Sequence, residues 1–272
     1  MKKFLYRFFL FFFAGVFLVS AFMLGRYWLN SKQNDDQYND LAEQVAQIQA
    51  QQTLPVPDDS DVPEVTDTTE PVQAPVSGGE RRILPEYAPL YEQNSDMVGW
   101  IQIPDTKINY PVMQTPNTPD YYLKHNFRKE YSSHGAIYVK EDCNVNLPSD
   151  NLIIYGHHMQ DASMFYELDK YKNQSYWENH QTFSFDTLTE HHTYEIFAVF
   201  KTTATVGEGF GYHKFVDAAD QAEFDEFVGA IKDMAFYETG ITPEYGDKLV
   251  CLSTCEYTQV NGRFVVVARR IS

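Results

Sequence analysis

Residues 248–270, KLVCLSTCEYTQVNGRFVVVARR, hold two apolar runs, 248–253 and 263–269, that predict two β-strands. Cys255 comes at the exit of the first predicted strand, and Arg263 comes at the entry of the second. If the two strands lie beside or near each other in one sheet, these two residues fall at the same end. The segment therefore predicts a thiol and a guanidinium that face one place.

A third apolar run, Asn-Leu-Ile-Ile-Tyr at 151–155, predicts another strand, and Gly156, His157 and His158 follow it directly. Strand ends and the loops after them are places where a rigid scaffold displays reactive groups. A cysteine, a histidine and an arginine together suit acyl transfer. The thiolate attacks a peptide carbonyl, and the imidazole gives a proton to the departing amine. The guanidinium, with its donors in a fixed fork, stabilises the oxyanion or holds the substrate backbone.

Each of these three residues also has an ordinary structural explanation. Cys255 is then a small core residue, His157 a buried histidine with satisfied hydrogen bonds, and Arg263 a surface cation. The cysteines Cys143, Cys251 and Cys255 are too few and of the wrong parity for a disulfide framework, so at least one thiol stays free. Parity alone does not say whether a free thiol is inert or reactive.

From about residue 84 onward, aromatic and β-branched runs alternate with turn residues, which is typical of a β-rich domain. The segment 222–234 places four apolar residues at i, i+3, i+4 and i+7, and Ser163 is a candidate cap for a helix at 164–171. Further strands are expected at 98–103, 108–113, 136–139 and 194–201, and a short helix at 87–94. The expected fold is mainly β with peripheral helices.

Three segments resemble, in order, the signature blocks of class B sortases: NLIIYGHHM at 151–159, LSTCEY at 252–257 and GRFVVVA at 262–268. Two further segments, YYLKHNF at 121–127 and SMF at 163–165, are also similar to the family. Three ordered blocks rarely coincide by chance. The resemblance therefore adds a family-level expectation to the residue chemistry.

The resemblance implies a sortase-type β-barrel with a catalytic triad of His157, Cys255 and Arg263. In the family the histidine follows a glycine directly, which selects His157 over His158. The resemblance also assigns four substrate-binding positions, Leu123, Tyr155, Ser253 and Glu256. Many sortases have threonine where this chain has Cys251, a departure expected to matter little because Cys251 lies inside a predicted strand. The chemistry implies no cofactor and no metal.

By the same resemblance, the enzyme is expected to cleave a C-terminal sorting motif of secreted proteins after a threonine, through a thioester on Cys255. An amine of the cell-wall peptidoglycan precursor then takes the acyl group. Class B members often prefer an Asn-Pro-x-Thr motif to Leu-Pro-x-Thr-Gly. Two alternatives stay open. One is a sortase that polymerises pili, and the other is a membrane-anchored surface binding protein without enzymatic activity.

The amino terminus predicts a single transmembrane helix. Lys2, Lys3 and Arg7 lie at the start of the chain, and the apolar stretch at 4–25 approaches the ~20 residues that span a bilayer. Positive charge before the apolar run favours a cytoplasmic amino terminus and an extracellular catalytic domain. The alternative is a cleaved signal peptide, because Val-Ser-Ala at 19–21 offers a small-residue cleavage site.

The chain is expected to have three parts: a cytoplasmic tip and transmembrane anchor at 1–29, an extracellular stalk and acidic, Pro-rich spacer at 30–85, and the catalytic domain at 86–272. The middle part has one aromatic residue, Tyr38, and six of the 13 prolines, so it cannot build a core of its own. Leu41, Val45 and Ile48 have helical spacing, which allows a short stalk helix. A solvated tether is nevertheless the preferred interpretation.

Charge and spacing disfavour several other functions. The formal net charge of -17 argues against nucleic acid as a partner, because binding phosphates needs a basic surface. A metal site built from Cys251, Cys255, His157 and His158 does not match the spacing of structural zinc sites. The acidic residues at 58–61 lack the glycine and glutamate of a calcium loop. Papain-like hydrolases place the cysteine before the histidine, which is the reverse of the order found here.

Overall fold

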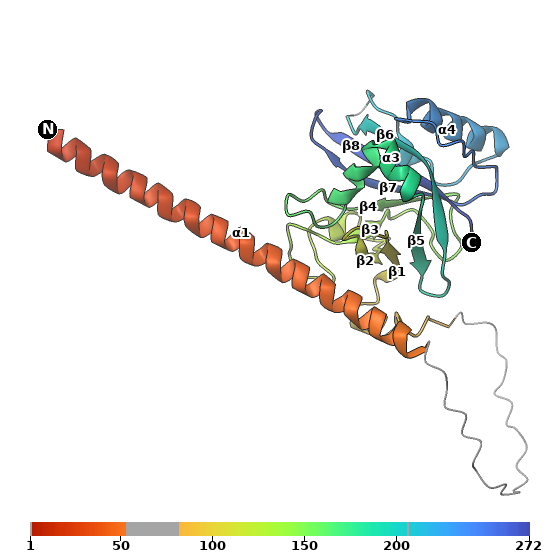
Figure 1. The fold of residues 1–272 in the computed structure, drawn as a ribbon, viewed down its shortest axis with the longest axis horizontal. Coiled ribbons are helices and arrows are strands. Elements are labelled where there is room, and N and C mark those ends of the chain that lie inside the picture. The colour runs from red at the N-terminus through yellow and green to blue at the C-terminus, as the bar shows by residue number, and fades with distance from the viewer. Residues whose placement is uncertain (1, 53–81, 206) are drawn as a thin grey trace, which may run out of the picture.

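The computed structural model describes residues 2–52, 82–205 and 207–272. Its centre is a closed β-barrel with the strand order β1-β2-β3-β4-β7-β8-β6-β5 (Figure 1). The strands are β1 (Met97–Gln102), β2 (Asn109–Met113), β3 (Ile137–Val139), β4 (Asn151–Tyr155), β5 (Thr182–Thr187), β6 (Thr193–Thr203), β7 (Leu249–Glu256) and β8 (Gly262–Arg270). Neighbours are antiparallel except β2–β3 and β4–β7, which are parallel. The expectation of a β-barrel with peripheral helices is confirmed.

The barrel interior is apolar and is formed largely by the central strands. Cys251 of β7 and Val266 of β8 are completely buried, and so are their apolar neighbours on both strands. Such runs are buried on both faces because helices and loops cover the outside of the barrel. β5 was not predicted, although Phe183 and Phe185 alternate with polar residues there and both are buried. This period-two pattern is the signal that could have identified the strand.

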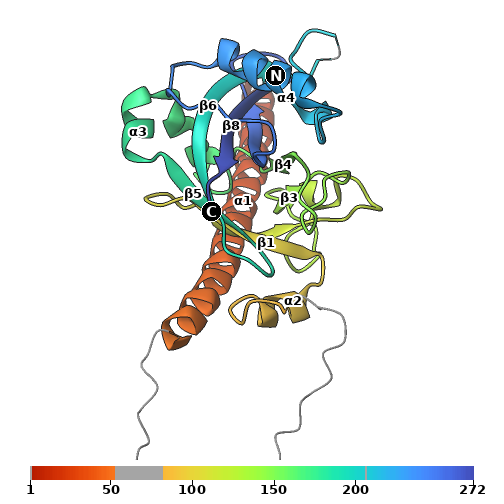
Figure 2. The same ribbon diagram turned by 90° about the vertical axis from the view of Figure 1, so that its right-hand side faces the viewer.

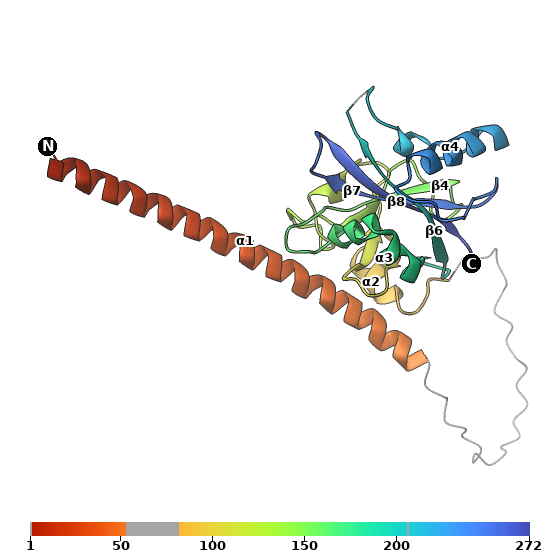
Figure 3. The ribbon, with the colours of Figure 1, turned by 45° about the horizontal axis from the view of Figure 1, so that its top comes forward.

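Short helical elements lie around the barrel. They are α2 (Ala88–Gln93), η1 (Tyr121–Leu123), η2 (Tyr166–Lys172), α3 (Gln174–Asn179), η3 (Tyr212–Lys214) and α4 (Gln221–Met234). The helix predicted at 222–234 is α4, which buries its apolar face and lies on the other side of the barrel from the amino-terminal helix (Figure 3). The helix predicted at 164–171 is instead the 3-10 helix η2. Ser163 does not cap it, because its hydroxyl donates to Asp161.

The amino-terminal helix α1 (Lys2–Gln52) is continuous and has two different halves. Its apolar side chains from Phe4 to Leu29 are exposed, and this part is long and apolar enough to cross a membrane. The second half packs along the barrel, where Tyr38, Leu41 and Val45 are buried (Figures 1 and 2). Helical spacing was therefore a correct indication for this segment.

The expected solvated tether is wrong for the part of the stalk that lies within α1. Tyr38, Leu41 and Val45 fall on one helix face, and burying that face against the barrel stabilises the packed arrangement. The expected Pro-rich spacer falls mostly at residues 53–81, which lie outside the described residues. The start of the catalytic domain at residue 86 stays a prediction.

Candidate active site

The two strands predicted in the segment 248–270 lie beside each other, which brings Cys255 and Arg263 together as expected. β7 and β8 are antiparallel neighbours, and Cys255 lies directly opposite Arg263 in their register. Residues opposite each other on paired strands have side chains on the same face, with Cβ atoms about 5 Å apart. Both residues lie inside the strands, because β7 extends to Glu256 and β8 begins at Gly262.

The histidine comes to the same place from β4. This strand runs parallel to β7, and its last residue, Tyr155, pairs with Ser253. Gly156 and His157 therefore leave the sheet beside Cys255. A Cβ on Gly156 would lie 2.5 Å from Ile137 Cδ1 and 2.6 Å from the Phe165 ring, so only glycine fits before His157. This close packing is the physical reason for the Gly-His pair.

His157, Cys255 and Arg263 line a single cavity of about 260 Å³. Leu123, Tyr155 and Ser253, which were expected to bind substrate, line it as well. Tyr212 and His213 of η3 also line it, but sequence reasoning missed them, because nothing in their local pattern indicates a site. Burial raises the pKa of Tyr212 to about 12, and its hydroxyl lies 2.6 Å from the Ser253 hydroxyl. For His213, burial and the nearby Lys140 lower the pKa of the imidazole.

The three thiols are in different environments. Cys143 and Cys251 are buried, whereas Cys255 is partly exposed at the cavity. Burial raises the pKa of the Cys143 thiol to about 12, and it also raises the pKa of Cys251. A thiol must ionise to act as a nucleophile, so these two are poorly suited to the task. Cys255 is the thiol that a substrate can reach.

One ring nitrogen of His157 has a defined partner. Its Nε2 lies 2.7 Å from the carbonyl oxygen of Leu123. A carbonyl oxygen can only accept a hydrogen bond, so Nε2 carries a hydrogen and the neutral ring has its free lone pair on Nδ1. The backbone of His157 is also held, since its carbonyl accepts from the Phe165 N–H at 2.9 Å. The hydrogen bond at one ring nitrogen sets the tautomer and so decides which nitrogen can exchange protons.

Arg263 is oriented by its own loop. Its Nη1 donates to the carbonyl of Gly262 at 3.0 Å and to that of Asn261 at 3.3 Å. These two bonds hold one end of the planar group, and Arg263 lines the cavity beside Cys255. Both bonds come from Nη1, and the planar fork of arginine offers further donors in fixed directions, which lysine lacks.

Glu256 is placed differently from the other predicted substrate-binding residues. It is 5% exposed and is not among the residues lining the cavity. Its carboxylate is 2.8 Å from Lys201 Nζ and accepts from the backbone and hydroxyl of Thr258. Burial acts to raise the pKa of Glu256, but the bonds from Lys201 and Thr258 outweigh it and lower that pKa. A structural role for this carboxylate accounts for its contacts.

His158, next to His157 in the chain, is not among the residues that line the cavity. Its ring packs against Tyr166 and Tyr257, and its Nε2 lies 3.1 Å from Asp169. In the described ranges, no group of three or more His, Cys, Asp or Glu side chains is arranged to hold a metal ion. The site therefore combines one accessible thiol, one oriented imidazole and one oriented guanidinium.

Comparison with known proteins gives a consistent result. The model of the sortase domain family matches residues 101–271. Sortase B of Listeria monocytogenes is 35% identical over 190 residues, which cover 69% of this chain and 74% of that protein. Sortase B of Staphylococcus aureus is 30% identical over 198 residues, which cover 72% of this chain and 79% of that protein.

Solved structures agree with these relatives. The structure of an S. aureus sortase B–substrate complex matches with a TM-score of 0.73 and 26% identity, covering 90% of this chain and 99% of that chain. A structure of Bacillus anthracis sortase B in complex with AAEK1 matches with a TM-score of 0.62 and 33% identity, covering 70% of this chain and 86% of that chain.

Proposed function

The chain belongs to the sortase family and is a class B cysteine transpeptidase, and from this premise we propose that it cleaves a C-terminal sorting motif of secreted proteins after a threonine. Cys255 is the nucleophile, His157 the proton donor and acceptor, and Arg263 the group that stabilises the oxyanion. The observation that carries this proposal is the pairing of Cys255 with Arg263 across β7 and β8, in a cavity that His157 also lines. Family membership removes the alternative of a binding protein without enzymatic activity.

The first half of the reaction forms a thioester. The Cys255 thiolate attacks the threonine carbonyl, and the new C–S bond moves an electron pair onto the carbonyl oxygen. Arg263 donates to this oxyanion. The tetrahedral species collapses and breaks the C–N bond, while the imidazolium of His157 gives its proton to the departing amine. The carboxy-terminal fragment leaves, and the substrate stays bound to Cys255.

The second half uses an amine of the cell-wall peptidoglycan precursor. The neutral imidazole of His157 takes a proton from this amine as its nitrogen attacks the thioester carbonyl. Collapse of the second tetrahedral species breaks the C–S bond and returns Cys255 as the thiolate. The product is an amide between the secreted protein and the precursor, and the protons and electrons balance over the two halves.

The anchor sets the place of the reaction. Residues 4–25 cross the membrane, with the basic amino terminus in the cytoplasm and the barrel outside. This orientation brings the cavity to the side of the membrane on which secreted proteins and peptidoglycan precursors meet.

The test uses the full chain in detergent with a panel of peptides carrying Asn-Pro-x-Thr and Leu-Pro-x-Thr-Gly motifs. We expect cleavage after threonine and an acyl adduct on Cys255, both seen by mass spectrometry. Adding small amines should release the adduct as an amide product. Absence of cleavage across the whole panel, or an adduct on another cysteine, would contradict the proposal.

A further inference from the structure

The packed half of α1 contacts the two loops that determine where the His157 ring lies. One is the loop between β4 and η2, which carries His157 itself. The other joins β2 to β3 and carries Leu123, whose carbonyl accepts from His157. Figure 2 shows α1 running along the barrel. The contact on the first loop is partly buried, and the contact on the second is buried.

The contact on the first loop centres on Asp161, four residues after His157. Its Oδ2 accepts from the Ser31 hydroxyl at 2.5 Å and lies 2.7 Å from Nε2 of the buried His134. Its Oδ1 accepts from the hydroxyl of Ser163 at 2.6 Å and from the backbone N–H of that residue at 3.2 Å. Asp161 thus joins three segments: α1, the β2–β3 loop and the β4–η2 loop, which we call the histidine loop.

These bonds determine the charge of Asp161. Burial acts to raise the pKa of this carboxyl, but the bonds from Ser163, Ser31 and His134 together lower it below its ordinary value. Asp161 is therefore a carboxylate at neutral pH, and charge-assisted hydrogen bonds of this kind are stronger than neutral ones.

The histidine loop needs such support. Ala162 and Met164 both have left-handed backbone conformations, with φ of +63° and +57°. Residues other than glycine adopt this region at a cost, and surrounding contacts must hold them there. The Met164 N–H donates to the Tyr110 hydroxyl at 3.1 Å, and the Tyr110 ring packs edge-on against Tyr38 of α1. A second route thus leads from α1 to the same loop.

The contact on the other loop lies directly behind the acceptor of His157. The Tyr38 hydroxyl donates to the carbonyl of Gly135 at 3.1 Å. Gly135 has φ of +60°, and a Cβ there would lie 2.5 Å from the Tyr122 carbonyl oxygen and 2.8 Å from that of Leu123. The segment held by Tyr38 is therefore in close contact with the oxygen that receives the Nε2 hydrogen of His157.

We propose that α1 is a positioning element of the active site, and that Ser31 and Tyr38 hold the His157 loop and the Leu123 carbonyl so that the imidazole keeps its Nε2-protonated tautomer. Nδ1 is then the nitrogen that exchanges protons with the leaving group and the acceptor amine. The inference rests on the proposed role of His157. Because α1 also contains the apolar span, one helix both anchors the enzyme and positions its proton donor.

The kinetic test compares Ser31→Ala, Tyr38→Phe and the double variant in the full chain in detergent. Each change removes one hydrogen bond with little change in volume. We expect kcat to fall about 3- to 10-fold in each single variant, with KM within about twofold, because a misplaced donor affects the transition state rather than peptide binding. The double variant should lose more than either single one.

Gln44→Ala is the matched control. Gln44 lies on the same helix and contacts Gln93 on an exposed surface, so its loss should change neither kcat nor KM. If Ser31→Ala and Tyr38→Phe behave like Gln44→Ala, the proposal is overturned.

A spectroscopic readout needs no substrate and therefore separates this inference from the proposed function. Nitrogen-15 NMR of the histidine rings, with His157 assigned through His157→Gln, should show the Nε2-protonated tautomer in the wild type. In the double variant we expect a mixture of both neutral tautomers. An unchanged tautomer would overturn the proposal even if kcat falls. The loss of kcat would then come from general destabilisation of the protein. Thermal unfolding of the same samples would measure that destabilisation.

Discussion

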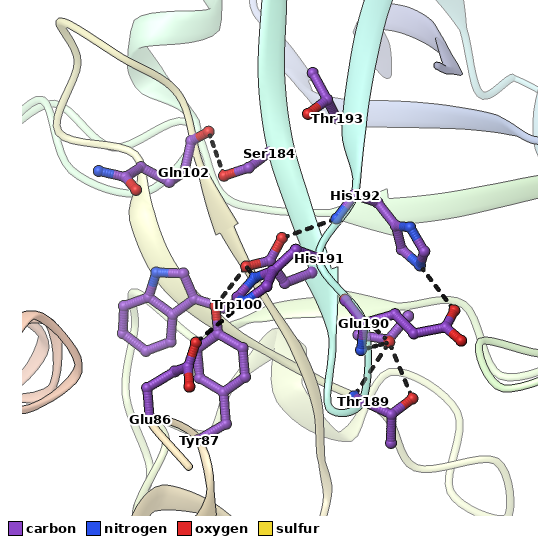
Figure 4. Close-up of polar contacts among 12 residues, drawn as sticks. Glu86, Tyr87, Trp100, Gln102, Ser184, Thr189, Glu190, His191, His192 and Thr193 are labelled. Atoms are coloured by element: carbon purple, nitrogen blue, oxygen red, sulfur yellow. Dashed lines mark hydrogen bonds and ion pairs between the residues drawn. The ribbon is translucent and has the colours of Figure 1, made fainter. Parts of the chain in front are cut away.

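Two histidines near opposite ends of β6 differ in how many of their ring nitrogens have a polar partner. At one end Thr202 pairs with Arg263 beside the cavity, and at the other Tyr194 pairs with Arg270. Near the cavity, His157 has a single backbone carbonyl as the partner of Nε2. Beyond the other end, His191 has a carboxylate next to each nitrogen (Figure 4).

The contacts of His191 are those of a structural residue. Its Nδ1 lies 2.7 Å from Asp186 and its Nε2 lies 3.2 Å from Glu86. Asp186 also accepts from the Tyr87 hydroxyl at 2.6 Å. This network joins the segment before α2 to the β5–β6 hairpin. A histidine is available for proton transfer only if one nitrogen remains free beside a cavity, and His157 meets this condition whereas His191 does not.

The largest expected effect comes from a substitution in the cavity beside the Thr202 end of β6. Cys255→Ala should abolish both cleavage and acyl capture, because it removes the proposed nucleophile. Cys251→Ala and Cys143→Ala should keep most activity, since both thiols are buried away from the cavity. The measurement is peptide cleavage with mass spectrometry of the intact protein. Activity in Cys255→Ala together with an inactive Cys251→Ala would mean that the nucleophile is misassigned.

The histidines allow the comparison to be tested directly. His157→Ala should lose ~10²–10⁴-fold in kcat/KM, which is the usual cost of a proton donor. His158→Ala should lose much less, because its ring packs against Tyr166 and Tyr257 outside the cavity. Equal losses in the two folded variants would remove the distinction between them.

Substitution of Arg263 distinguishes two roles for its guanidinium group. Arg263→Lys keeps the charge but loses the fork, so turnover should fall by about 10²–10³-fold, the range for one lost oxyanion donor. If Arg263 acted only through its charge on Cys255, lysine would rescue much of the activity. The rate of thiol alkylation against pH, measured on the same variants, separates the two roles.

A change in the network around His191 should lower the stability of the fold and leave catalysis unchanged. His191→Ala removes one partner each from the buried Glu86 and from Asp186, and should lower the free energy of unfolding by about 1 kcal/mol. Its kcat/KM should stay at the wild-type value. Urea unfolding and peptide cleavage on one preparation measure both quantities. A large catalytic loss at unchanged stability would show that the two ends are not independent.

The smallest expected effect depends on pH. The pKa of Glu256 is lower in the folded protein than its ordinary value, so its carboxylate stabilises the fold above that ordinary pKa. The contribution disappears as pH falls through the folded pKa. The difference in Tm between wild type and Glu256→Gln should therefore be present at pH 7 and should shrink in acid below about pH 4. A difference that does not depend on pH would exclude this role.

Much of the fold and the site could be predicted because the signals are local. The apolar run at 151–155 is β4, and the pairing of Cys255 with Arg263 follows from two strands joined by a short connection. The apolar face of α4 has the helical period in its own sequence. Such patterns depend on neighbours along the chain, so the sequence alone contains them.

The sequence by itself thus determined every barrel strand except β5, and it predicted that Cys255, His157 and Arg263 lie together. Only the tertiary structure decided that Tyr38 of α1 packs behind Gly135 and that the Leu123 carbonyl fixes the His157 ring. It also decided that Glu256 pairs with Lys201 rather than lining the cavity. The reason is physical. A backbone carbonyl has no residue signature, and contacts between distant segments exist only once the barrel has closed and α1 lies against it.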